Sequence, residues 1–178
     1  MVGGIGVSGA NEEQDRLIAE AGVGALMGGT LTSAVMEAKI RSYFDACNTG
    51  DAEAIAAFFT PDGVHYFPPG MYEGPFVGAA TIGRRWSEAV EELGSVWTVD
   101  HVICDPYTAR AVIEWTHFKT FSNTVLRGDE WYRFDPKTGL ITEIRAYYAS
   151  PQDAALATLE LGGFDYDGRS YPLISPID

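Results

Sequence analysis

The second half of the chain alternates in side-chain type at every second residue, from Ser95 to Ser150. Four runs carry this alternation, and the short segments DPYT, SN and DPKTG separate them. Period two is the repeat of a β-strand, and short turns built from Asp, Pro, Asn and Gly join antiparallel neighbours. The pattern therefore predicts an antiparallel meander, with strands over 95–104, 108–121, 124–134 and 140–150.

The first half of the chain predicts helices. Thr32 or Ser33 is suited to cap a helix over 33–51, in which apolar residues recur at three- and four-residue spacing. Capping and stop residues predict three other helices, over 11–29, 52–63 and 79–94, and a short one after Pro151. Helices that precede a meander favour an α+β fold, with the helices packed on one face of a curved sheet.

The length of 178 residues suits a single domain. We expect a flexible N-terminus over 1–10, a domain over 11–150 that includes an extra N-terminal helix, and a C-terminal helix and tail over 151–178. Gly4, Gly6 and Gly9 match a dinucleotide-binding fingerprint in their letters only, because no strand precedes them.

The formal net charge of −13 disfavours nucleic acid and anionic membrane surfaces as partners. The chain opens with no basic leader and contains no apolar stretch long enough to span a bilayer, so we expect a soluble, cytoplasmic protein. Cys47 and Cys104 form neither a disulfide framework nor a metal-ligand spacing, and we interpret them as small buried hydrophobes.

Histidines stand out in the predicted strands. In a bent sheet alternate residues face the concave side, so an inward His117 brings Trp115 with it. His101 on the preceding strand and His65 on a short earlier strand are expected to point to the same space. All three histidines of the chain would then converge on one apolar hollow.

The following strand adds a carboxyl group. If Glu130 faces inward, Tyr132 does so too, whereas a bulge would turn Asp129 inward instead. An outward Glu130 paired with Arg133 or Arg145 is the alternative. Apolar walls with a few polar groups are typical of a small-molecule site.

Three segments, IRSYFDACNTGDAEAIAAFFTPDGVHY, YEGPFVGAATI and WYRFDPKTGLITEIRAYY, resemble the NTF2-like superfamily, and most of all its SnoaL-like, ketosteroid-isomerase-like branch. The resemblance covers about Ala34 to Ser150. It implies a cone in which a strongly bent antiparallel sheet wraps a long helix and leaves a deep apolar pocket. It also implies a homodimer or higher homo-oligomer, without cofactor or metal. The branch contains isomerases, dehydratases, polyketide cyclases, epoxide hydrolases and members without known catalysis.

The resemblance also implies roles for single residues. Tyr43, before NTGD, matches a tyrosine of the ketosteroid isomerases, and Glu130 or Asp129 matches their second acid. Phe67 stands where those enzymes have their aspartate base, so that base is absent. We expect His117 or His101 to be the general base instead, while Glu130 or Asp129 and Tyr43 polarise the substrate oxygen and His65 assists. His101 and His117 match histidines of scytalone dehydratase.

Limonene-epoxide hydrolase-like members have an Arg-x-Asp sequence, which Arg127 and Asp129 match. Ala146 stands where those members have their other aspartate, so only part of that set is present.

These groups are suited to proton transfer. Histidine exchanges a proton near neutrality, and a carboxyl in an apolar pocket can stay protonated and donate to a developing oxyanion. We expect a cofactor-independent acid–base lyase or isomerase (dehydration, retro-aldol cleavage or double-bond shift) acting on a small hydrophobic, aromatic or cyclic substrate. The alternatives are a non-catalytic dimeric binding protein and an epoxide hydrolase. The candidate catalytic residues are His117, His101, Glu130, Asp129, Tyr43 and His65, and the candidate substrate-binding residues are Phe67, Trp86, Trp115, Tyr132 and Tyr148.

Overall fold

Three helices and six strands form the part of the chain that the computed structural model describes, residues 31–148, 163–165 and 168. The helices are α2 (Ser33–Thr49), α3 (Ala52–Ala56) and α4 (Ala79–Leu93). The strands are β1 (Phe59–Tyr66), β2 (Phe76–Val77), β3 (Ser95–Asp105), β4 (Arg110–Lys119), β5 (Thr124–Phe134) and β6 (Ile141–Tyr147). The N-terminal segment, the helix predicted over 11–29 and the helix predicted after Pro151 lie outside the described residues.

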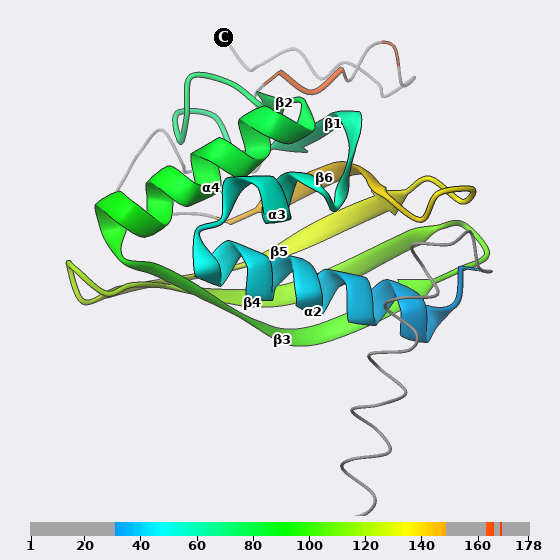
Figure 1. Ribbon diagram of the computed structural model, residues 1–178, viewed down its shortest axis with the longest axis horizontal. Coiled ribbons are helices and arrows are strands. Elements are labelled where there is room, and N and C mark those ends of the chain that lie inside the picture. The colour runs from blue at the N-terminus through cyan, green and yellow to red at the C-terminus, as the bar shows by residue number, and fades with distance from the viewer. Residues whose placement is uncertain (1–30, 149–162, 166–167, 169–178) are drawn as a thin grey trace, which may run out of the picture.

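The strands form one curled sheet in the order β2-β1-β6-β5-β4-β3, and the helices lie on its concave side (Figure 1). The predicted α+β class, with a bent sheet around a long helix, is confirmed. The sheet is mixed rather than antiparallel throughout, because β1 pairs with β6 in the parallel direction. The chain leaves β1, passes through α4 to the far edge at β3, and returns along the meander to β1.

The long helix α2 supplies the centre of the core. Thr32 caps its first turn by accepting a hydrogen bond from the Val35 backbone, and Gly50 ends it with a left-handed φ of 71°. One face of α2 is buried, as the apolar spacing predicted; it carries Met36, Lys39, Ile40, Tyr43, Phe44 and Cys47.

Helix α3 is shorter than predicted. Asp51 caps it through hydrogen bonds from the Glu53 and Ala54 backbone amides, but it ends at Ala56 instead of continuing to residue 63. Phe59 opens a strand because it pairs with Ile141, far away in the sequence. Pro61 lies in an irregular stretch of β1, where a missing backbone donor is tolerated.

A bulge divides β3. Trp97 pairs with His117 and Val99 with Trp115, but the next pair is His101 with Glu114, so Asp100 is one additional residue. The bulge reverses the alternation for the rest of the strand. His101 consequently faces the outer, convex side of the sheet.

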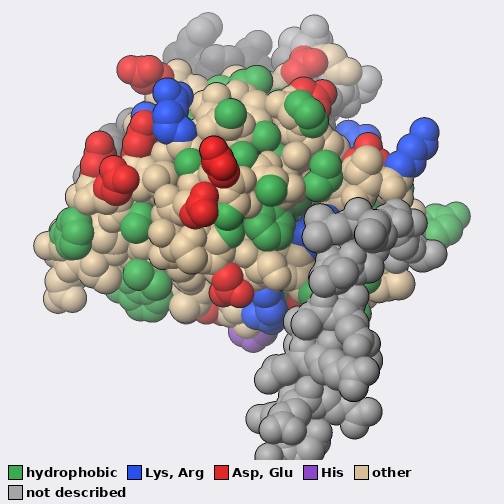
Figure 2. Space-filling view, in the orientation of Figure 1, with side chains coloured by type: hydrophobic (Ala, Val, Ile, Leu, Met, Phe, Trp, Pro, Cys, Tyr) green, Lys and Arg blue, Asp and Glu red, His purple; other side chains and the backbone are tan. Residues whose placement is uncertain are grey.

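The helical face of the molecule carries many more acidic than basic side chains (Figure 2). This agrees with the net charge of −13 over the whole chain. No helix in the described part of the chain has the length and apolar character that crossing a bilayer requires.

Candidate active site

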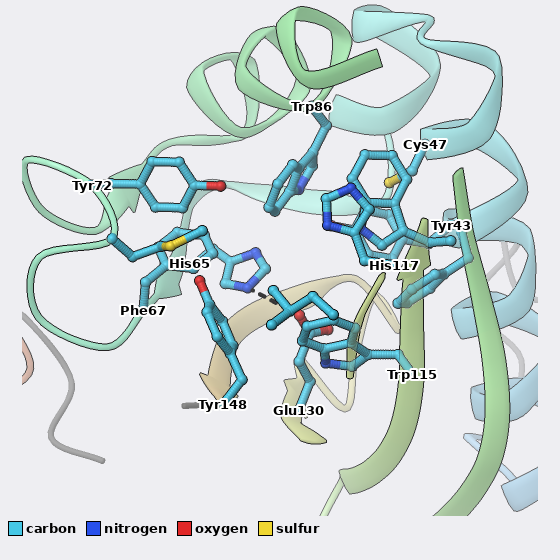
Figure 3. A pocket seen from close by; sticks show the side chains of 14 residues that line it. Tyr43, Cys47, His65, Phe67, Tyr72, Trp86, Trp115, His117, Glu130 and Tyr148 are labelled. Atoms are coloured by element: carbon cyan, nitrogen blue, oxygen red, sulfur yellow. Dashed lines mark ion pairs between the residues drawn. The ribbon is translucent and has the colours of Figure 1, made fainter. Parts of the chain in front are cut away.

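A pocket opens between the helices and the concave face of the sheet (Figure 3). Fourteen side chains line it: Tyr43, Phe44, Cys47, His65, Phe67, Met71, Tyr72, Trp86, Trp97, Trp115, His117, Leu126, Glu130 and Tyr148. The free space between them is about 40 Å³, which is room for a few water molecules. A six-membered ring therefore needs a wall side chain to move, and Met71 and Leu126 are the flexible aliphatic ones.

Glu130 and His65 meet inside this pocket. Nε2 of His65 lies 3.4 Å from Oε1 of Glu130, and the two residues are 1% and 7% exposed. The other carboxylate oxygen, Oε2, accepts a 2.6 Å hydrogen bond from the Tyr132 hydroxyl. Neither ring nitrogen of His65 has a hydrogen-bond partner among the described residues, so the 3.4 Å approach to Glu130 is a contact without hydrogen-bond geometry. A carboxyl and an imidazole in contact, shielded from water, are a pair that can pass a proton.

The uninterrupted register of β4 and β5 places Glu130. Ile113 pairs with Glu130, and cross-strand partners share a face, so Glu130 lies on the same concave side as Ile113, Trp115 and His117. Asp129 is exposed on the outer face. The inward orientation of Glu130 is thus confirmed, whereas the alternatives with Asp129 inward or Glu130 outward are wrong.

The expected position of His101 is wrong. Its side chain is 80% exposed, and its Nδ1 lies 2.8 Å from Oε2 of Glu114 on the outer face. Arg127 joins the same cluster, with contacts of 2.7 Å to Glu114 and 3.2 Å to Asp100. Two histidines rather than three converge on the pocket, and Arg127 and Asp129 both lie outside it.

His117 faces the pocket as predicted. Its Nε2 lies 2.8 Å from the Ser95 hydroxyl oxygen, and its ring stacks on Trp97 with 4.5 Å between centroids. Burial, followed by the charge of Lys119, lowers the pKa of His117 to about 4. The imidazole is therefore neutral at pH 7 and only weakly basic.

Among the predicted tyrosines, Tyr43 and Tyr148 line the pocket. Burial raises the pKa of both phenols, so each stays protonated. Tyr132, a predicted substrate-binding residue, is not among the residues that line the pocket. Its hydroxyl instead donates a hydrogen bond to the Glu130 carboxyl.

The remaining predicted wall residues, Phe67, Trp86 and Trp115, all line the pocket. Phe67 stacks on His65 with 4.2 Å between ring centroids. The sequence-based prediction missed Trp97 and Ser95. Both lie on the concave face of β3, where Trp97 is the cross-strand partner of His117. The prediction also missed Tyr72, which lies in the loop between β1 and β2, where no periodicity indicates a direction.

No group of three His, Cys, Asp or Glu side chains in the described residues is arranged to hold a metal ion. The polar groups of the pocket are one carboxyl, two imidazoles and several phenols and indoles. These groups can donate and accept protons and hydrogen bonds directly.

Several solved structures are similar to this chain. A protein of unknown function with a cystatin-like fold, from Methylobium petroleophilum PM1, is 56% identical over 84% of this chain and 99% of its own, with a TM-score of 0.77. SalBIII, an epoxide hydrolase/cyclase-like enzyme with a role in pyran ring formation in the polyether salinomycin, is 17% identical, with coverages of 64% and 90% and a TM-score of 0.54. A putative polyketide cyclase from Sinorhizobium meliloti is 19% identical, with coverages of 61% and 92% and a TM-score of 0.51.

No curated protein matches the sequence. The SnoaL-like domain family matches residues 40–144, which include most of α2, most of the meander and both Glu130 and His65. The similarity to the two enzymes is similarity of fold. The match to the domain covers more than half of the chain. The chain belongs to the SnoaL-like domain family of the NTF2-like superfamily.

Proposed function

We propose that the protein is a cofactor-independent acid–base lyase or isomerase that acts on a small, hydrophobic, cyclic substrate. The observation that carries the proposal is the contact between Glu130 and His65, both buried, in a pocket whose other walls are mainly aromatic. Perturbed or paired titratable groups in an apolar pocket mark candidate catalytic sites. Membership of the family, which includes small-molecule isomerases and cyclases, agrees with it.

Within the proposal, Glu130 is the proton acceptor. It removes a proton from a carbon beside a carbonyl group; the C–H electron pair forms a new C=C bond, and the displaced π electrons of the C=O bond move to the oxygen. In an isomerisation those electrons return and Glu130 delivers the proton to another carbon. In a dehydration the electrons on the oxygen reform the C=O bond, the enolate C=C pair shifts toward the next carbon, and the hydroxyl there leaves as water with the proton that Glu130 removed, passed on through His65.

The choice of Glu130 follows from the geometry of the histidines. His101 lies on the outer face, and His117 is too weakly basic to hold a proton at pH 7. Tyr132 fixes one oxygen of the carboxyl and leaves the other beside His65. His117 and Tyr43 are then groups that orient the substrate.

Exchange of substrate protons for deuterium tests the proposal without knowledge of the natural product. A panel of small cyclic ketones and phenols is incubated with the protein in D₂O, and the signals of protons next to the oxygen-bearing carbon are followed by ¹H NMR. We expect exchange faster than in buffer, and a loss of about 10²- to 10⁴-fold in Glu130→Gln.

Glu114→Gln is the matched control, since it changes an acid on the outer face of the neighbouring strand, and we expect it to exchange like the wild type. If wild-type protein binds the compounds without accelerating exchange, the non-catalytic binding function is supported instead. Epoxide hydrolysis that disappears in Asp129→Asn would support the alternative that the epoxide hydrolase resemblance implies.

A further inference from the structure

Two phenols of the pocket have no role in the proton transfer described above. Tyr72 comes from the loop between β1 and β2, and Tyr148 directly follows β6. Both line the pocket, and in Figure 3 both hydroxyl groups point into it near the His65 ring. Neither hydroxyl has a hydrogen-bond partner among the described residues. Neither oxygen is among the buried polar atoms without a partner, so both hydroxyls reach the free space of the pocket, where each can donate a hydrogen bond to a polar atom of a ligand.

The position of Tyr72 is well determined by its neighbours. Its ring packs against Phe67 and Phe76, with centroids 4.6 Å and 4.7 Å away. The guanidinium of Arg85 lies over the same ring, 5.6 Å from its centroid. These contacts hold the ring on three sides and leave the hydroxyl end toward the pocket.

Tyr148 is held from the opposite side. Its ring meets Trp115 edge to face, with 5.6 Å between centroids. Gly128 makes room for this pair, because a Cβ there would lie 2.7 Å from Cζ2 of Trp115 and 2.9 Å from Cβ of Tyr148. A glycine at this point of β5 thus sets the position of both aromatic side chains.

Both phenols act as donors at the pH of the cell. Burial is the main cause that raises the pKa of Tyr72 to about 12 and raises that of Tyr148 further. The charges of Tyr72 and Glu130 also raise the pKa of Tyr148. A carbonyl oxygen has two lone pairs and can accept one hydrogen bond from each hydroxyl.

We infer that Tyr72 and Tyr148 form an oxygen-binding subsite, and that the substrate is a neutral cyclic ketone or enone whose carbonyl oxygen accepts a hydrogen bond from each phenol. A neutral molecule fits better than an anion, because Glu130 lies in the pocket and the chain carries a net charge of −13. The carbon next to the carbonyl then lies near Glu130 and His65. This last step rests on the proposed function, but the oxygen-binding subsite is tested by binding alone.

Cyclohexanone and methylenecyclohexane are suitable probes, since they have nearly the same shape and only the ketone has an oxygen. Their dissociation constants are measured by quenching of tryptophan fluorescence, because Trp86, Trp97 and Trp115 line the pocket. We expect wild-type protein to bind the ketone more tightly. Tyr72→Phe and Tyr148→Phe should each weaken ketone binding by roughly 2- to 12-fold and leave methylenecyclohexane binding unchanged.

Tyr107→Phe is the control, since Tyr107 is 97% exposed in the turn between β3 and β4. The C=O stretch of ¹³C-labelled cyclohexanone gives a second readout and should move to higher frequency in both pocket variants. Equal affinity of the wild type for the two probes, no binding of either probe, or variants that keep the ketone preference would each overturn the inference. Glu130→Gln should bind cyclohexanone but not exchange its protons, so a failed binding test and a failed exchange test have separate meanings.

Discussion

Burial decides the charge of the His117 imidazole and makes the stability of the protein depend on pH. The folded-state pKa of His117 is about 4, against about 6.5 for histidine in an unfolded chain. As the pH falls, the unfolded state binds this proton first, so stability is lost between about pH 6.5 and pH 4. We expect this residue to lower the free energy of unfolding by roughly 3 kcal/mol across this pH range. Urea unfolding across this range measures it, and His117→Gln should have a correspondingly flatter profile. Parallel profiles would contradict the assignment.

Tyr132 holds the proposed catalytic carboxyl and should also stabilise the fold. Among the described side chains, Tyr132 alone donates a hydrogen bond to Glu130, and its hydroxyl oxygen lies 2.6 Å from Oε2. Both residues are buried. Tyr132→Phe leaves a buried carboxylate oxygen without this donor, so we expect a loss of roughly 1.5–3 kcal/mol in the free energy of unfolding. Urea denaturation measures the loss, and the exposed Tyr107→Phe serves as reference. Equal stability of the two variants would count against this role.

The residue types in the sequence predicted which side chains line the pocket better than they predicted on which face of the sheet each side chain lies. Glu130, His65, His117 and Tyr43 were candidates because of their chemistry, and all four line the pocket. The choice between Glu130 and Asp129 stayed open because alternation gives two opposite answers until the register is known. The pairing of Ile113 with Glu130 fixes that register.

Helices α3 and α4 pack closely enough that one methyl group should disturb them. A Cβ at Gly83 of α4 would collide with the carbonyl oxygen of Ala52 and lie 3.3 Å from Cβ of Ala56 in α3. Gly83→Ala should therefore cost about 1–3 kcal/mol, although alanine is the better helix former. Thermal unfolding measures this. Gly74→Ala, where no heavy atom lies within 4 Å of the added methyl group, should have little effect. A Gly83→Ala protein as stable as the wild type would show that the helices can separate.

The elements with strong local periodicity were predicted closely, and those set by distant contacts were not. The boundaries of α2, α4 and β5 agree with the apolar spacing and turn residues within two residues. Helix α3 was predicted too long because its last residues join β6 instead, through Phe59 and Ile141. The parallel pairing of β1 with β6 leaves no local signal either, since it depends on the path of the whole chain.

The outer face of the sheet carries exposed apolar side chains at its two ends, which favours the homodimer predicted from the family resemblance. Exposed large side chains occur at both ends of this face: Val96, Phe118 and Val125 at one, and Ile103 and Trp131 at the other. Between the two ends lie acidic and basic side chains, among them Glu114 and Arg127. In a dimer with two-fold symmetry, the acidic side chains of one copy can lie against the basic side chains of the other. Sedimentation velocity should give a dimer for the wild type and a monomer for Phe118→Glu.

Tyr107→Glu is the control for this experiment because Tyr107 is more exposed but lies in a turn away from the face. It should remain dimeric. A monomeric wild type at about 100 µM, well above the dissociation constants of stable dimers, would contradict the prediction.

The bulge at Asp100 governs how this chain should be aligned with its relatives. Val102 and Cys104 occupy the inward positions that Ile103 and Asp105 would take in an uninterrupted strand. An alignment needs a one-position gap at Asp100 to bring equivalent faces of the sheet into the same column. Without that gap, a histidine inside another member's pocket is matched to His101, and a catalytic group is transferred to a position in open solvent.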